Sequence, residues 1–168
     1  MSGALAAVTA ADADPEARLQ RALDLAYRYL GRRDRTVAEM RRHLEAKRVE
    51  PDAIDGAVAA LHEQGYLDDA RYAQRFAEDR RELDGWGAER IARKLASVGI
   101  DADHIDAACS ARDHEAELQA AIEVLRRRFR EPPETDRDRD RALGMLVRKG
   151  YELDLAYSAV RLMHSRRF

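Results

Sequence analysis

Cysteine, glycine, proline and aromatic residues are all scarce in this chain of 168 residues, and each shortage excludes some structures. The single cysteine, Cys109, cannot form an internal disulfide and fits a reducing compartment. Only 9 glycines and 4 prolines are present, so long helices can form with few interruptions. Valine, isoleucine and threonine are too sparse and too irregularly spaced to indicate a sheet. We therefore expect an all-α protein.

A strong excess of one charge is also lacking, although 37% of the residues are charged. The 30 basic and 32 acidic side chains leave a net charge of −2, which argues against a DNA-binding protein whose whole surface is basic. No apolar run approaches the roughly 18 residues of a membrane-spanning helix. The acidic, alanine-rich start does not resemble a signal peptide. We expect a cytoplasmic protein in which residues 1–15 form a disordered tail.

A repeat with a step of 51 residues is present in the sequence. The step relates three leucines, Leu44, Leu95 and Leu146. It also relates three further columns of mostly apolar residues: Val49, Ile100 and Tyr151; Val58, Cys109 and Val160; and Met40, Ile91 and Ala142. Short helical windows share apolar spacing by chance, but four columns in register over three copies indicate a true repeat.

The residues expected at helix ends follow the same step. It places acceptable N-cap residues before the first helix of each aligned stretch: Thr36, Gly87 and Asp138. Thr36 and Glu39 fit a capping box, in which each side chain accepts a hydrogen bond from the other's backbone. Gly99 and Gly150 stand where the helix should end in a left-handed residue. The first copy has Arg48 at this place, so its helix end is less clear.

A further helix precedes each aligned pair, so each repeat should hold three helices. We expect the repeats at residues 16–67, 68–114 and 115–168. Asp68 and Asp69 should cap the first helix of the second repeat after a stop at Gly65. Residues 132–141 read as a charged linker that begins with two prolines. Three such repeats in a row would form one elongated, curved array with a long concave surface for a large partner.

No arrangement of residues typical of catalysis or of a cofactor site stands out. Gly85 and Gly87 lack the Lys-Ser/Thr pair that completes a phosphate-binding loop. None of the five histidines forms the i, i+4 pair of a helical zinc site. Cys109 occupies an apolar repeat column and should be a small buried hydrophobe. We predict a non-enzyme without cofactor or metal. Trp86 could contact a partner or cover the seam between two repeats, and we favour the seam because a single tryptophan usually packs against its own protein.

Three stretches of the sequence carry a resemblance to a known family. Residues 33–36, which lead to Glu39, Met40 and Leu44, resemble a basic, capped opening helix of that family. The segment Gly65–Ala73, with the sequence GYLDDARYA, resembles its most recognisable junction. Residues 87–91, with Leu95 and Gly99-Ile100, are similar to its second-repeat helix. The likeness runs from about Leu19 to Arg166 and weakens after His114. The family is RecX, the bacterial regulators of the RecA recombinase.

The resemblance implies a function that composition and spacing do not show. A RecX protein would dock into the groove of the RecA filament on single-stranded DNA and inhibit its ATPase, recombinase and strand-exchange activities. It would act in DNA repair, recombination and the SOS response, as a monomer, with at most weak direct contact to DNA. One departure concerns His43, because the family often has lysine there.

Exposed basic residues opposite the apolar stripes are the candidates for contact with a partner. In the first repeat they are Arg32, Arg33, Arg41, Arg42, Lys47 and Arg48, and in the second Arg71, Arg75, Arg90, Arg93 and Lys94. Residues 126–130 form another basic cluster, with Phe129 expected in the core. The alternative is a solvated face stabilised by pairs such as Glu89–Arg93.

Two other functions stay open from the residues themselves. The first is direct nucleic-acid binding through a helix–turn–helix-like pair at residues 89–97 and 102–111. The near-neutral charge weighs against it, and a salt series without RecA would test it. The second is a generic helical-repeat adaptor for some other protein.

Overall fold

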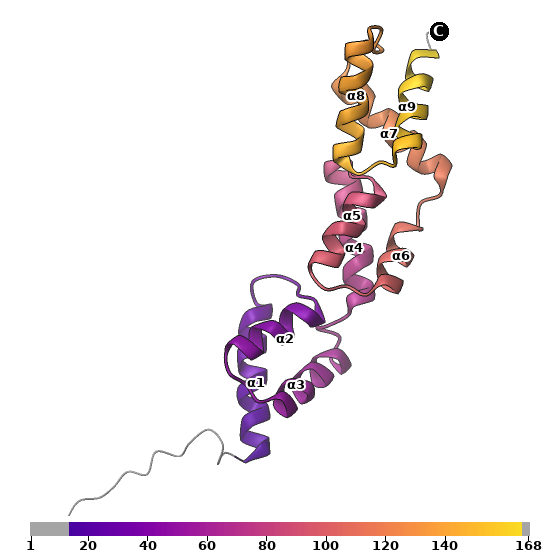
Figure 1. The fold of residues 1–168 in the computed structure, drawn as a ribbon. Coiled ribbons are helices and arrows are strands. Elements are labelled where there is room, and N and C mark those ends of the chain that lie inside the picture. The colour runs from indigo at the N-terminus through magenta and orange to yellow at the C-terminus, as the bar shows by residue number, and fades with distance from the viewer. Residues whose placement is uncertain (1–13, 166–168) are drawn as a thin grey trace, which may run out of the picture. The chain divides into compact units, whose positions relative to one another are not determined.

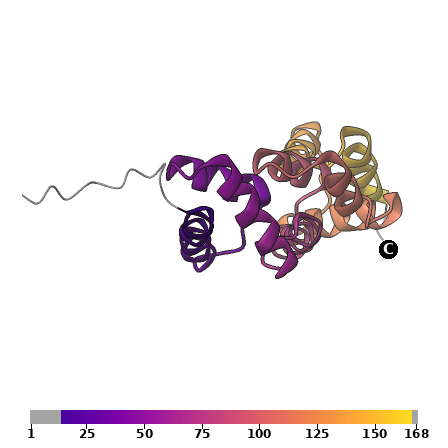
Figure 2. The same ribbon diagram turned by 90° about the horizontal axis from the view of Figure 1, so that it is seen from below.

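The computed structural model describes residues 14–165, with side chains up to Met163, and in this range the chain forms nine α-helices and no strand (Figures 1 and 2). The helices are α1 (Pro15–Leu30), α2 (Val37–Ala46), α3 (Pro51–Glu63), α4 (Asp69–Asp84), α5 (Ala88–Ser97), α6 (Ala102–Cys109), α7 (His114–Arg128), α8 (Asp136–Lys149) and α9 (Leu153–Ser165). The predicted all-α class is confirmed. The predicted tail lies outside the described residues, except that Pro15 already opens α1.

The helices group in threes around three separate hydrophobic cores, as the repeat predicts. Helices α1–α3 enclose the first core, α4–α6 the second and α7–α9 the third. The chain divides into two compact units, Met1–Asp68 and Asp69–Phe168, so the second and third repeats share one unit. The leucine column of the repeat forms the centre of each core, because Leu44, Leu95 and Leu146 are all fully buried.

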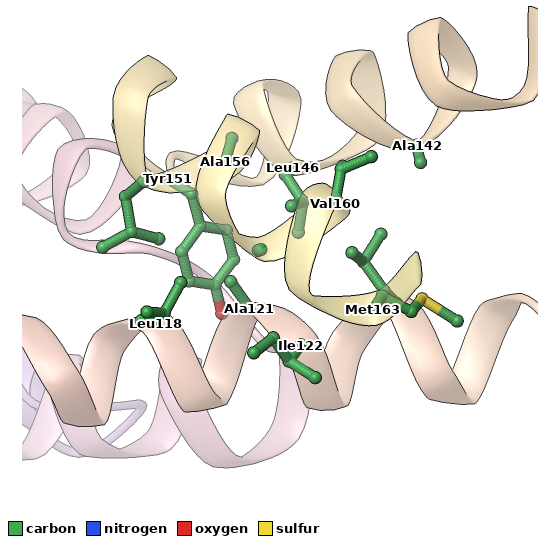
Figure 3. Packing of buried hydrophobic residues seen from close by; sticks show 12 residues of the cluster. Leu118, Ala121, Ile122, Ala142, Leu146, Tyr151, Ala156, Val160 and Met163 are labelled. Atoms are coloured by element: carbon green, nitrogen blue, oxygen red, sulfur yellow. The ribbon is translucent and has the colours of Figure 1, made fainter. Parts of the chain in front are cut away.

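Tyr151 anchors the third core. Figure 3 shows its ring between Leu118 of α7 and Ala156 of α9, and the residue is only 1% exposed. Burial raises the pKa of the Tyr151 hydroxyl to about 12. The hydroxyl donates a hydrogen bond to the carbonyl oxygen of Gly85, 3.2 Å away. The buried ring therefore also fixes the loop between α4 and α5.

The middle helix of each repeat ends in the same way. The residue after its last turn is left-handed, with φ of 57° at Arg48, 83° at Gly99 and 92° at Gly150. The next backbone N–H then donates back to the leucine of the repeat, at 3.1 Å in all three copies. This closure satisfies a helix-end carbonyl. Arg48 thus takes the conformation of its glycine counterparts, although its Cβ makes that conformation strained.

The beginnings of these helices agree with the prediction in two copies and differ in the third. At α2 the capping box is complete, because Thr36 Oγ1 accepts from the Glu39 amide and Glu39 accepts from the Thr36 amide, both at 3.1 Å. Gly87 is the N-cap of α5. The predicted N-cap Asp138 is wrong. Thr135 caps α8 instead, since its hydroxyl accepts from the Asp138 amide at 3.1 Å.

The expected linker over residues 132–141 is also too long. Extended backbone at Thr135 and its cap start α8 at Asp136, so only the residues before it connect α7 to α8. Asp136 and Asp138 then lie in the first turn, where carboxylates favour the helix dipole. The charged residues from Asp136 onward, which suggested a linker, therefore form the first turns of α8.

Candidate partner-binding site

The candidate basic residues of the first repeat differ in how free they are to meet a partner. Arg33 pairs with Glu39 at 2.5 Å, and Arg41 pairs with Asp55 at 2.7 Å. Arg42 is exposed but donates to a carbonyl of its own helix. Three exposed side chains form no ion pair with any carboxylate of the described residues: Arg32, Lys47 and Arg48. Contact of these three side chains with another molecule would break no ion pair of the described residues.

A stack of three side chains lies close to Lys47, and no pattern in the sequence predicts it. The rings of Tyr29 and His43 lie parallel, 3.9 Å apart between centroids, and the Arg35 guanidinium lies 3.9 Å from the Tyr29 centroid. Partial burial lowers the pKa of His43, and the positive charges of Lys47 and Arg35 lower it further. The neutral His43 ring can therefore stack flat on the Tyr29 ring. Arg35 lies between this stack and Glu39, whose carboxylate oxygen is 4.0 Å from the guanidinium, so it is not one of the exposed cations.

Glu39 organises the loop between α1 and α2. Burial works against its charge, but the hydrogen bonds from Arg33 and the Thr36 amide, with the charges of Arg33 and Arg35, lower the pKa of its carboxyl below the ordinary value. The carboxylate therefore serves both the capping box and the loop arginines. It fixes the segment between α1 and α2, which carries two of the candidate cations.

In the second repeat, Arg71, Arg75, Arg93 and Lys94 are exposed on α4 and α5. Arg90 differs, because it is half-buried, lies 4.1 Å from the Trp86 ring centroid and donates to the Arg148 carbonyl at 3.2 Å. The expected pair between Glu89 and Arg93 is wrong, since no ion pair joins them in the structure that covers residues 14–163.

Trp86 packs within the second repeat, so its predicted role as a cover over the seam between repeats stays a prediction. Its ring meets Phe76 edge to face, with centroids 6.2 Å apart, and packs on the second core. Arg90 covers the ring and reaches across to the third repeat through Arg148. Cys109 packs on the same core, where burial raises the pKa of its thiol. A half-buried thiol of this kind fits the predicted structural role.

The N-terminus of α5 is capped by the third repeat instead of by its own side chains. The amide of Gly87 donates to the Lys149 carbonyl at 2.8 Å, and that of Glu89 to the Gly150 carbonyl at 3.0 Å. Between them, the Ala88 amide donates to the Glu117 carboxylate at 2.9 Å. The start of α5 and the end of α8 thus satisfy each other's unpaired backbone groups. The second and third repeats are joined as one body by this contact.

These features define a class of protein. The described chain is built from three-helix repeats and displays exposed cations. No group of three or more His, Cys, Asp or Glu residues that could hold a metal occurs in its described part. None of the helices found between residues 14 and 165 is long and apolar enough to cross a bilayer. The class is that of helical-repeat proteins.

Comparisons with known proteins identify the family. Three family models match in order: the first three-helix domain of RecX at residues 22–61, the second at 68–108 and the third at 115–160. The regulatory protein RecX of Xanthomonas citri is 35% identical over 144 residues, which is 85% of this chain and 85% of the relative. That of Streptomyces coelicolor is 30% identical over 149 residues, or 88% and 79%. The chain therefore belongs to the RecX family of regulatory proteins.

Solved structures show the same fold. The crystal structure of RecX from Lactobacillus salivarius has a TM-score of 0.76 at 18% identity and covers 88% of this chain and 97% of its own. A second crystal structure of a regulatory protein RecX has a TM-score of 0.71 at 23% identity, covering 88% and 73%. The three-helix repeats seen here are thus those of the family, which is known for the regulation of RecA.

Proposed function

We propose that this protein binds the RecA filament on single-stranded DNA and inhibits its ATPase, recombinase and strand-exchange activities. The observation that carries the proposal is the match of all three repeats, in order, to the three RecX domains. Such a regulator acts through binding, as a cytoplasmic monomer that needs no cofactor and catalyses no reaction. Its place is in DNA repair, recombination and the SOS response, and any contact to DNA itself is weak.

The basic residues of the first repeat provide the contact. Arg32, Lys47 and Arg48 are exposed and lack carboxylate partners among the described residues, so binding need not break an internal pair. A single exposed ion pair contributes about 0–1 kcal/mol. Several such contacts must therefore act together, with Arg93 and Lys94 of the second repeat supplying further positive charge. Binding that depends on these contacts weakens as salt increases.

The test is a titration of the purified protein into RecA, single-stranded DNA and ATP. ATP hydrolysis should fall at amounts of protein below that of RecA. A variant that combines Arg32→Gln, Lys47→Gln and Arg48→Gln should need at least about tenfold more protein for the same effect, since three contacts are lost. The matched control combines Arg21→Gln, Arg28→Gln and Arg137→Gln, because these three arginines are also exposed and lie outside the candidate set.

Two outcomes count against the proposal. Unchanged ATP hydrolysis and strand exchange at a large excess of folded protein would reject inhibition of RecA. Tight binding to single-stranded DNA without RecA, with a steep loss of affinity as salt rises, would favour a direct nucleic-acid binder instead.

A further inference from the structure

A small pocket of about 300 Å³ opens on the third repeat, between the end of α7 and one face of α8. The residues that line it are Arg128, Phe129, Arg141, Met145 and Arg148. None of them belongs to the basic residues of the first two repeats that the proposed function uses. The pocket is thus a separate feature of the chain.

The helices bring these side chains together. Arg141, Met145 and Arg148 follow each other at i, i+4 and i+7, so they share one face of α8. Arg128 is the last residue of α7, and the Phe129 amide closes that helix with a bond of 2.8 Å to the Leu125 carbonyl. Phe129 and Met145 are partly buried and pack on the third core. The pocket therefore combines an apolar part, held by the core, with three exposed guanidinium groups.

The three guanidinium groups have no counter-charge among the described side chains. Within the part of the chain whose side chains are described, none of Arg128, Arg141 and Arg148 forms an ion pair. Neighbouring arginines do find partners, since Arg126 pairs with Glu123 at 2.9 Å and Arg139 with Asp136 at 3.1 Å. Like charges around one pocket repel each other, and a bound anion would relieve that repulsion.

Gly144 supports this arrangement. A glycine inside a helix is less favourable than alanine, and Gly144 lies well within α8. A Cβ at this position would lie 3.2 Å from Nη1 of Arg148, closer than an ordinary contact. The absence of a side chain therefore leaves room for the Arg148 guanidinium to lie along the helix beside the pocket.

The pocket favours one kind of anion. A planar guanidinium matches a carboxylate with two parallel hydrogen bonds, and the apolar part would receive a neighbouring apolar side chain. The connection and helix start that precede Arg141 carry five carboxylates, namely Glu131, Glu134, Asp136, Asp138 and Asp140. A continuous polyanion such as nucleic acid would be repelled by them, whereas one short anionic group would not.

We propose that this pocket binds a single carboxylate next to an apolar side chain on a partner protein. The proposal depends on the geometry of the third repeat and not on the function proposed above. Its two parts make separate contributions: the arginines hold the carboxylate, and Phe129 with Met145 contact the apolar side chain.

Fluorescence anisotropy with the full chain tests it. The probe is a labelled peptide of three serines, one aspartate, leucine and phenylalanine, with an amidated end, so that it carries a single carboxylate. Arg141→Gln and Arg148→Gln should each weaken binding by about tenfold, because each removes a charge-assisted hydrogen bond. Arg127→Gln removes the same charge from an exposed neighbour on α7 that does not line the pocket, and it should change affinity by less than about twofold.

A further variant separates binding from folding. Gly144→Ala should raise the midpoint of thermal unfolding, because alanine favours the helix, and should still weaken peptide binding several-fold by displacing Arg148. Unchanged affinity in both this variant and Arg148→Gln would contradict the role of Arg148.

Three other results would overturn the proposal. The first is no binding of the peptide by the parent protein. The second is equal binding of a peptide whose last two residues are serine, since the pocket would then be a simple anion site. The third is tighter binding of oligothymidylate with the same dependence on Arg141 and Arg148, which would assign the pocket to phosphodiesters.

Discussion

Gly87 and Gly150 meet backbone to backbone where the second and third repeats join. A Cβ on Gly87 would lie 2.4 Å from the carbonyl oxygen of Gly150, and one on Gly150 would lie 2.3 Å from Cβ of Arg90. Neither distance is possible for a real side chain, and the nearest atoms at Gly87 belong to the backbone, which cannot turn aside. The close contact between the start of α5 and the end of α8 therefore requires glycine at both positions, which lie 63 residues apart in the sequence.

Replacement of Gly87 by alanine should destabilise the second unit. Gly87 has φ of −82°, which alanine adopts freely, so the whole effect comes from the enforced separation of α5 and α8. We expect a loss of about 1–3 kcal/mol in the free energy of unfolding. Urea unfolding followed by the fluorescence of Trp86, the one tryptophan of the chain, measures this unit alone.

Gly144→Ala is the matched control for that experiment. It makes the same chemical change in the same unit, but only the far end of the flexible Arg148 side chain lies close. It should stabilise the unit by about 0.5–1 kcal/mol, because helix propensity improves. Equal stability of the Gly87→Ala variant and the parent would show that the junction does not depend on close approach.

Loss of the capping box at α2 should destabilise the first unit. Thr36 is fully buried, and its hydroxyl accepts from the Glu39 amide. Thr36→Ala should cost about 1 kcal/mol, whereas Thr36→Ser should cost less because serine retains the acceptor. Circular dichroism during urea unfolding measures the change, and similar losses for alanine and serine would rule out the cap as its cause.

Glu39 should make the same unit sensitive to acid. The pKa of its carboxyl is lowered in the folded protein, so the ionised form stabilises the fold above the ordinary value of 4.5. That contribution is lost as pH falls from 4.5 through the lowered pKa. In Glu39→Gln the free energy of unfolding should therefore be smaller at pH 7 and fall less between pH 5 and pH 3. An unchanged pH profile would contradict the lowered pKa.

Arg48→Gly should stabilise the first unit and weaken binding to RecA. The left-handed backbone at Arg48 is strained for any residue with a Cβ, while glycine adopts it freely. We expect a net gain of about 0.5–1 kcal/mol after the larger chain entropy of glycine in the unfolded state is deducted. Lys47→Gly, one residue earlier with φ of −87°, should give no such gain. A destabilised Arg48→Gly variant would contradict the strain.

The sequence predicted what depends on local chemistry. The 51-residue step located the buried leucines, and Gly99 and Gly150 marked two of the helix ends that the structure shows. The expected cap at Asp138 failed because the step carries no information on helix length, and Thr135 provides a better cap three residues earlier. The proposed repeat boundaries at residues 67/68 and 114/115 stay predictions.

The site could be predicted only in outline. Composition identified exposed arginines on helices, but it did not show which of them form ion pairs. Arg41 pairs with Asp55, whereas Arg32 forms no ion pair with a carboxylate of the described residues. The stack of Tyr29 on His43 joins residues 14 positions apart on two helices, and no helical period predicts such a pair. Contacts of this kind depend on the angle at which two helices pack, and that angle cannot be predicted from a single sequence.

His43 should give the first unit a second dependence on pH, in a different range. Its folded-state pKa is lowered from 6.5, so its neutral form contributes stability above that value, and the contribution is lost as pH falls through the lowered pKa. Protonation would place a third positive charge beside Arg35 and Lys47 and weaken the stack on Tyr29. His43→Phe keeps an aromatic ring that does not titrate. Its unfolding free energy should therefore change less than that of the parent between pH 7 and pH 5, where Glu39 is still ionised. The proton resonances of the His43 ring, followed by NMR, give the pKa directly, and a value at or above 6.5 would contradict the prediction.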